Sequence, residues 1–287
     1  MLAVLFAALS GGLFGTLAVA VRHGLQRGGE PEVGGLVVAV VALGVSAIAA
    51  VADGAWTSVS DLWPFFVAGL LVPGASQILF IKSVRDAGPS RAAILIGTAP
   101  LMSVLIAIAL LGEPAKVELL AGTVLVVAGG VSLGRERIRP EHFRALGAVL
   151  ALVCAGLFAI RDNLVRWGTR DVHPPALLAS TTALLAATLF LVAYVAAFRL
   201  RDFRSRLRRA APAFWPAGVA LGLAYDSLLE AFDHGRVSVV APLNATQSLW
   251  TVVFAAALIG RSEMIGRRTV LAGLLVVAGG ALIGIFR

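Results

Sequence analysis

Long apolar runs separated by short charged breaks dominate the chain. A helix that crosses the hydrocarbon core of a membrane needs about 20 apolar residues, and ten runs approach this length. The predicted spans are residues 2–21, 34–52, 63–82, 91–111, 117–134, 145–166, 175–198, 214–232, 237–259 and 269–286. Several breaks are so short that neighbouring helices must run antiparallel. The pattern therefore predicts an all-α membrane protein with ten transmembrane helices.

The second half of the chain repeats short segments of the first half in the same order. Several matches at a nearly constant offset indicate a duplication, whereas one match between apolar sequences would be weak. The matching segments are Gly-Leu-Phe at 12–14 and 156–158, Val-Arg at 21–22 and 165–166, and Val-Val-Ala-Gly-Gly at 126–130 and 276–280.

The duplication divides the chain into one five-helix repeat over residues 1–134 and a second over residues 135–287, within one membrane domain. Because each repeat has an odd number of spans, the second enters the membrane from the opposite side. This is an inverted-topology repeat, and transporters built in this way bind their substrate near the midplane, between the halves. The pattern therefore points to transport of a small-molecule substrate.

Composition supports a protein whose main partner is the lipid bilayer. Hydrophobic residues make up 59% of the chain and charged residues only 14%, against about 25% charged residues in soluble domains. The net charge of +8 does not indicate a nucleic-acid partner, because the basic residues lie in short clusters between the apolar runs. A single cysteine and four scattered histidines predict neither a disulfide framework nor a metal site, and no cofactor is expected.

The region between the fourth and fifth spans carries a family resemblance. Gly112-Glu113 precede the fifth span, which is rich in glycine, and Gly260 and Glu263 precede the tenth, with two additional residues between them. Together with the duplicated five-helix unit, this resembles the drug/metabolite transporter superfamily, in its ten-helix EamA-type branch. The resemblance covers nearly the whole chain. It implies secondary export or exchange of amino acids, other metabolites, drugs or sugars across the cell inner membrane, without choosing among them.

Lysine and arginine are distributed unequally between the two sides of the predicted bundle. The loops after the odd-numbered spans carry 18 of the 24 basic residues. Positive charge is retained on the cytoplasmic side, so these loops are predicted to be cytoplasmic and both termini to lie outside. The alternative is that the arginines have no topological meaning.

Charged residues inside two spans of the second half are the first candidates for a binding site. Such groups are costly in a membrane and commonly face the interior of the bundle. Asp226 and Glu230 are four residues apart and share one face of the eighth span. Arg161 in the sixth span is expected at a depth similar to that of Asp226, because these two spans run in the same direction.

The ninth span adds polar residues at the same level. Asp226 and Asn244 are each nine residues from Gly235, in the turn between the two spans, and Gln247 lies one turn deeper. Pro242 beside them frees a backbone carbonyl, as in helices that bend or gate.

We therefore predict one polar cavity, whose five polar members are Arg161, Asp226, Glu230, Asn244 and Gln247. The acids would bind a proton, as a coupling ion, or an ammonium group, and Arg161 would bind a carboxylate. Tyr225 and Trp250 would supply an aromatic wall. Two alternatives stay open: a clamp between Arg161 and Asp226 that only holds two helices together, or span boundaries that place Arg161 and Glu230 near loops.

The first half supplies fewer candidates. Gln77 follows Pro73 in the third span and is a candidate for the cavity or for a bond between helices, while Pro73 and Pro100 predict kinks. The G-x-x-x-G pairs of the fifth and tenth spans predict packing seams, either within the chain or in a homodimer.

Four classes of function are compatible with a polytopic membrane protein. An intramembrane enzyme is disfavoured, because the sequence contains no H-E-x-x-H, no G-x-S-x-G and no nucleotide-binding loop. A lipid-carrier flippase would need a groove open to the bilayer. A scaffold would favour a sealed core with Arg161 paired to Asp226. An open cavity would favour a secondary transporter, which the repeat itself predicts.

Overall fold

The structure is a computed structural model, which describes residues 1–54, 56–111, 117–135, 143–168, 174–198, 202–234, 240, 243–244, 246–260 and 265–286. The first half contains α1 (Leu2–Gln26), α2 (Pro31–Asp53), α3 (Val59–Gly69), the π-helix η1 (Leu70–Ala75), α4 (Ser76–Ala87), α5 (Pro89–Ile96), α6 (Ala99–Leu111) and α7 (Val117–Gly134). The second half contains α8 (Ala145–Gly168), α9 (Ala176–Ala197), α10 (Phe203–His234), α12 (Gln247–Leu258) and α13 (Arg267–Phe286). The described residues contain helices and no strand.

These helices form the ten predicted spans and confirm the fold class. The run α3–η1–α4 makes the third span, and the pair α5–α6 makes the fourth. By length and composition, five helical stretches among the described residues are sufficient to cross a membrane: Leu2–Gln26, Pro31–Asp53, Val59–Ala87, Ala145–Val165 and Ala176–Ala197.

The ends of the helices follow local sequence signals. Pro31 and Pro89 begin α2 and α5, because the fixed φ of proline suits the first turn of a helix. Gly54 ends α2 with a φ of 68°, a conformation that favours glycine. One predicted boundary was wrong: α10 begins at Phe203, well before residue 214. The apolar run does begin near residue 214, but the arginine-rich segment before it continues the helix, since arginine is a good helix former.

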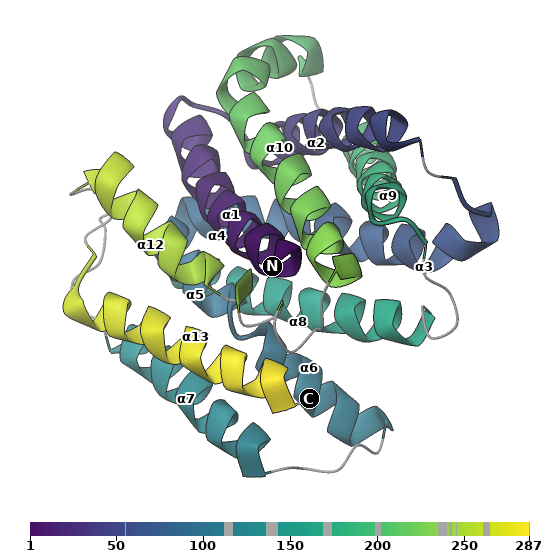
Figure 1. The fold of residues 1–287 in the computed structure, drawn as a ribbon. Coiled ribbons are helices and arrows are strands. Elements are labelled where there is room, and N and C mark those ends of the chain that lie inside the picture. Colours follow the sequence, from purple (N-terminus) through teal and green to yellow (C-terminus); the bar gives the residue numbers. More distant parts are fainter. Residues whose placement is uncertain are drawn as a thin grey trace.

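The contacts between helices obey a two-fold relation between the halves. Helix α1 packs on α10, as its repeat equivalent α8 packs on α4. Helix α2 packs on α10, as α9 packs on α3 and η1. Helices of equivalent spans also pack on each other, α2 on α9 and α7 on α13. Helices α7 and α13 lie side by side in Figure 1. A pseudo-two-fold axis through the bundle produces this pattern, as an inverted repeat requires.

The glycine-rich helices α7 and α13 form one of these seams. A Cβ on Gly122 would lie 2.9 Å from the Gly279 carbonyl oxygen, and a Cβ on Gly279 would lie 2.6 Å from that of Gly122. The two backbones therefore approach each other as closely as glycine permits. These two glycines are in contact within the chain; a homodimer through the same helices stays a prediction.

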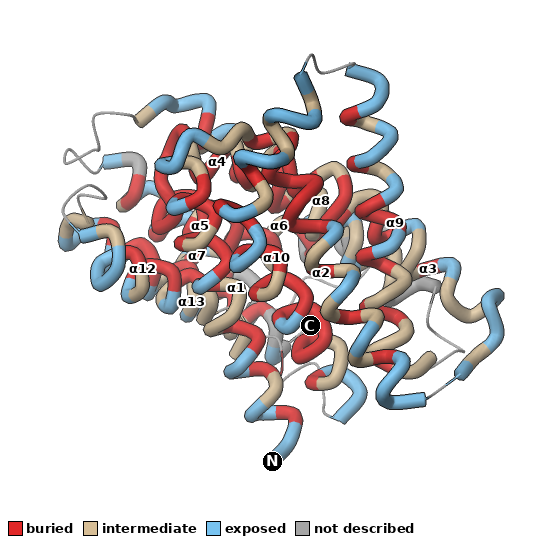
Figure 2. The backbone as a smooth tube through the Cα atoms, turned by 90° about the horizontal axis from the view of Figure 1, so that it is seen from above, coloured by how far each residue is buried: buried red, intermediate tan, exposed pale blue. Residues whose placement is uncertain are grey.

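Buried residues gather toward the middle of the bundle and exposed residues lie toward its outside (Figure 2). Many of the exposed residues have large apolar side chains. Ile48, Val51 and Leu258 are 73%, 82% and 74% exposed. A soluble protein would not leave so many of these side chains in water. Lipid tails are the solvent that this surface fits.

Candidate functional site

A small cavity lies between the two halves, with a volume of about 40 Å³. Six spans line it, those that contain α1, η1 with α4, α5, α8, α10 and α12. They form three pairs of repeat equivalents. Phe14 and Phe158, which occupy matching positions in the two repeats, both belong to the lining. The cavity therefore lies on the pseudo-two-fold axis.

Two equivalent spans are interrupted beside this cavity. In the fourth span, α5 ends at Ile96 and α6 begins at Ala99. Between them, Thr98 Oγ1 donates to the Leu95 carbonyl at 2.7 Å. In the ninth span, Thr246 Oγ1 donates to the Leu243 carbonyl at 2.6 Å, and α12 begins at the next residue. The same hydroxyl-to-carbonyl bond thus marks both breaks.

Pro242 predicted a bend in the ninth span, and the break that the structure describes lies at Thr246. The threonine hydroxyl competes for the backbone carbonyl at the break. Pro100, predicted to kink the fourth span, lies in the first turn of α6, two residues after Thr98. Pro242 lies outside the described residues. Gln247 is the first residue of α12 and lines the cavity, so the positive end of that helix dipole lies at the cavity wall.

The third span is also interrupted at the cavity. Val72 has φ −140° and ψ 116°, in the middle of η1, and the cis-proline Pro73 follows it. The Val72 carbonyl belongs to this non-helical backbone. Tyr225 of α10 donates its hydroxyl hydrogen to this carbonyl at 3.1 Å, so a side chain from the other half satisfies the break.

Tyr225 also holds Arg161. The Arg161 Nη1 donates to the Tyr225 hydroxyl at 3.0 Å, and its Nε donates to Asp162 Oδ1 at 2.7 Å. The guanidinium lies 5.0 Å from the centre of the Phe158 ring. Arg161 therefore pairs with its neighbour Asp162 rather than with Asp226, and the predicted clamp is not formed.

Asp226 faces away from the cavity. Its Oδ1 accepts hydrogen bonds from Ser46 of α2 at 2.5 Å and from Ser180 of α9 at 2.6 Å. The preceding residue, Tyr225, lines the cavity. Because successive residues of a helix point about 100° apart, α10 presents one residue to the cavity and the next to the α2–α9 seam.

Asn244 and Trp250 lie outside the lining. Ser10 of α1 donates to the Ala224 carbonyl at 2.9 Å and to Asn244 Oδ1 at 3.3 Å, which places Asn244 close to the level of Asp226 as predicted. Trp250 is 41% exposed and stacks on Phe254, with ring centres 5.5 Å apart. Its Cβ lies on the α1 backbone at Gly15.

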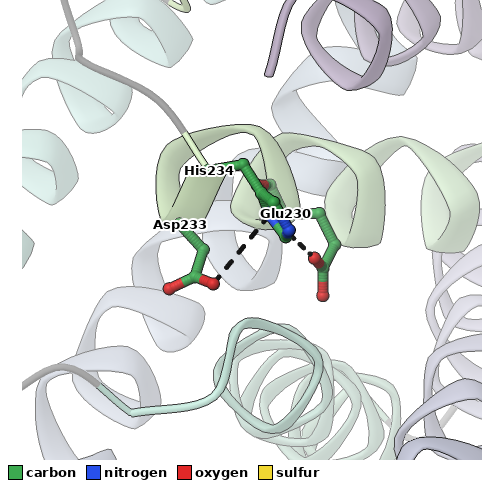
Figure 3. A group of neighbouring side chains, drawn as sticks. All are labelled: Glu230, Asp233 and His234. Carbon is green, nitrogen blue, oxygen red and sulfur yellow. Dashed lines mark hydrogen bonds and ion pairs between the residues drawn. The ribbon is translucent and has the colours of Figure 1, made fainter. Parts of the chain in front are cut away.

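Glu230 lies near the C-terminal end of α10, with Asp233 and His234 (Figure 3). His234 Nδ1 is 3.4 Å from the Glu230 carboxylate and 3.9 Å from that of Asp233. The three potential ligand atoms lie within 4.8 Å of one another, but Asp233 and His234 are exposed. Surface clusters of this kind are common without a metal ion, so the arrangement fits a solvated helix end.

Gln77 is a buried polar side chain of the cavity wall. It lines the cavity from α4 and is 3% exposed. Among the described residues, its Nε2 has no hydrogen-bond partner. A buried donor without an acceptor is costly, and a ligand in the cavity would supply the acceptor.

Comparison with known proteins agrees with the repeat. The model of the EamA-like transporter family matches residues 1–134 and again residues 145–285. The chain belongs to the EamA-like transporter family. It is therefore an integral, multi-pass membrane protein of a family of transporters, not of enzymes.

A solved structure, described only as the crystal structure of a protein, has the same fold. It is 22% identical, with a TM-score of 0.61, and the match covers 99% of this chain and 96% of the other. None of the curated proteins matches the chain at a significant level.

In this EamA-like transporter, the predicted site residues do not form one site. Pro73, Gln77, Tyr225 and Gln247 line the cavity, and Arg161 reaches it through Tyr225. The apolar and hydroxyl part of the lining was not predicted from the sequence: Phe14, Phe80, Phe158, Ser76 and Thr251. The recurrence of Gly-Leu-Phe was the signal that identified two of these residues as equivalent, although it was used only to detect the repeat.

Proposed function

We propose that the protein is a secondary active transporter that exports a small amphipathic molecule across the cell inner membrane by alternating access. The observation that carries this proposal is a cavity on the axis between inverted halves, lined by interrupted helices. Breaks of this kind are tolerated within a membrane where they line a cavity, and they surround the substrate sites of transporters with inverted repeats.

The lining favours a substrate with an apolar body and a few polar groups. Phe14, Phe80 and Phe158 contribute aromatic rings, which bury apolar surface and stack on flat groups. Gln77 and Gln247 contribute amides. A carbonyl, hydroxyl or carboxylate oxygen would accept from Gln77 Nε2, which lacks a partner among the described residues.

The alternatives have less support. A scaffold would be favoured by a sealed core with Arg161 paired to Asp226, whereas Arg161 pairs with Asp162 beside a cavity. A lipid-carrier flippase would place a long acyl or polyprenyl chain in a groove toward the bilayer, whereas this cavity has walls from six spans.

The test is a thermal-shift screen of the purified protein against amino acids, sugars, nucleosides and quaternary amines, with aromatic and aliphatic members in each class. A ligand that binds only the folded state raises the melting temperature by mass action. Hits are then assayed for counterflow in proteoliposomes. We expect hits among compounds with a ring or a branched apolar group. Binding without counterflow, or counterflow that survives when Phe14 and Phe158 are both changed to Ala, would contradict transport through this cavity.

A further inference from the structure

The Asp226 carboxylate is buried at a seam that joins the two halves. Its residue is 7% exposed, and both serines that donate to it, Ser46 and Ser180, are fully buried. Ser46 belongs to the first half, whereas Ser180 and Asp226 belong to the second. Thr181 Oγ1 lies 3.0 Å from Ser46 Oγ and extends the hydroxyl cluster. The other carboxylate oxygen, Oδ2, is buried and has no partner among the described residues.

Cations are remote from this carboxylate in the described residues. Helices α1, α2 and α9 pack on α10. The titratable residues of α9 are limited to Tyr194, near the C-terminal end of the helix, whereas Ser180 lies near its start. Those of α2 are Glu32 and Asp53, in its first and last turns. Helix α1 carries Arg22 and His23 in its last turns, whereas its Ser10 lies beside Ala224 of α10.

On α10 itself, the titratable neighbours of Asp226 are Tyr225, bonded to Arg161, and the acid Glu230 one turn further. The guanidinium of Arg161 is paired with Asp162. Among the described residues, the surroundings of Asp226 therefore provide hydroxyl donors for one oxygen and no counter-ion.

Without a counter-ion, the carboxylate is more costly in this packing than the neutral carboxyl group. An ionised side chain inside a membrane protein needs a counter-ion or water, and among the described residues Oδ2 is buried and has no hydrogen-bond partner. The distances also argue against a sodium ion among these oxygens. Ser46 Oγ is 2.5 Å from Asp226 Oδ1 and 3.2 Å from Ser180 Oγ. Hydrogen bonds at such distances already join the oxygens and leave no space between them for an ion.

We propose, on the basis of the transport function inferred above, that Asp226 takes up and releases the coupling proton at the α2–α9–α10 seam, apart from the substrate cavity. Uptake of one proton from water forms an O–H bond at Oδ2 and removes the negative charge. Release breaks that bond, returns the proton to water and leaves a carboxylate that must be hydrated. Hydration requires the seam to open.

Proton release is thereby linked to a movement between the halves. Ser46 is bonded across the seam to Asp226 and Ser180, so opening it separates α2 of the first half from α9 and α10 of the second. Tyr225, the residue before Asp226, holds the broken third span through the Val72 carbonyl at the cavity wall. A shift of α10 at the seam therefore also moves Tyr225, which contacts the cavity wall.

Infrared spectroscopy of the full chain in nanodiscs tests the site without a substrate, with protons as the probe. We expect a protonated-carboxyl band at neutral pH that disappears in Asp226→Asn and persists in Asp233→Asn, an exposed acid on the same helix. The Ser46→Ala/Ser180→Ala variant should retain the band at a higher frequency, because the carboxyl oxygen loses two donors. This variant keeps the test decisive if Asp226→Asn fails to fold.

Hydrogen exchange supplies the conformational readout. After correction for the intrinsic pH dependence of amide exchange, exchange in the peptide covering residues 176–184 should increase at least threefold from pH 6 to pH 9 in the wild type, and should not change in Asp226→Asn. A band insensitive to Asp226→Asn, or to loss of both serines, overturns the proposal even if transport is established. If the band is assigned to Asp226 but no transported substrate is found, the transport function is contradicted, whereas the protonation of Asp226 still stands.

Discussion

Phe14 and Phe158 face the same cavity from equivalent positions in two oppositely inserted halves. Each follows the same Gly-Leu dipeptide, and each lies on the first span of its repeat. Both positions reach the cavity because it lies on the axis that relates the two halves.

Gln77→Leu is predicted to separate ligand affinity from protein stability. The change removes a buried donor that has no partner among the described residues, so the empty protein should become more stable, by about 1–3 kcal/mol if the full desolvation penalty is recovered. Ligands identified in the thermal-shift screen should bind at least tenfold more weakly. Equilibrium unfolding and ligand titrations measure the two effects. The matched control is Gln26→Leu, at the exposed end of α1, and equal effects in both variants would exclude Gln77 from the binding site.

Asp226→Asn is predicted to abolish substrate flux or to remove its pH dependence, while the protein still inserts. The amide has nearly the shape of the acid and accepts from Ser46 and Ser180, but it cannot gain or lose the proton. Flux in proteoliposomes between pH 5.5 and 8.5, with insertion checked by size-exclusion chromatography, measures the effect. Unchanged flux at every pH would remove Asp226 from the mechanism.

Gly122→Ala is predicted to destabilise the seam between α7 and α13. The new methyl group would lie 2.7 Å from Ile283 Cγ1 and 2.9 Å from the Gly279 carbonyl oxygen, and overpacking of this kind costs about 1–3 kcal/mol. Gly130→Ala on the same helix is the control, since nothing lies within 4 Å of its added Cβ. Thermal unfolding should show a lower midpoint only for Gly122→Ala. If the protein forms a homodimer that depends on Gly130, the Gly130→Ala variant should lose the dimer.

Tyr225→Phe is predicted to loosen the break in the third span. The hydroxyl accepts from Arg161 and donates to the Val72 carbonyl, and its removal leaves that buried carbonyl without this donor. We expect a loss of about 1–3 kcal/mol in stability and weaker ligand binding. Tyr194→Phe is the control, because Tyr194 contacts Phe198 through its ring at the end of α9. Equal melting temperatures for the two variants would show that the Tyr225 hydroxyl does not hold the break.

The break in the ninth span shows why some of the local structure could not be predicted. Pro242 and Pro100 predicted bends in the ninth and fourth spans, but neither Thr246 nor Thr98 is unusual in a membrane helix, so the position of each break could not be predicted. The threonine hydroxyls bond to carbonyls three residues earlier in helices as well as at breaks. Their common role becomes visible only when both breaks are seen at the same cavity.

The sequence by itself determined the ten spans, their duplication and the inverted relation of the halves, because apolar length and internal repetition are properties of the chain alone. Only the tertiary structure decided which polar residues share a site. Tyr225 and Asp226 are adjacent in the chain, yet one turns to the cavity and the other to Ser46 and Ser180. The physical reason is that the face each residue presents depends on the rotation of α10 about its axis, and packing against α1, α2 and α9 fixes that rotation.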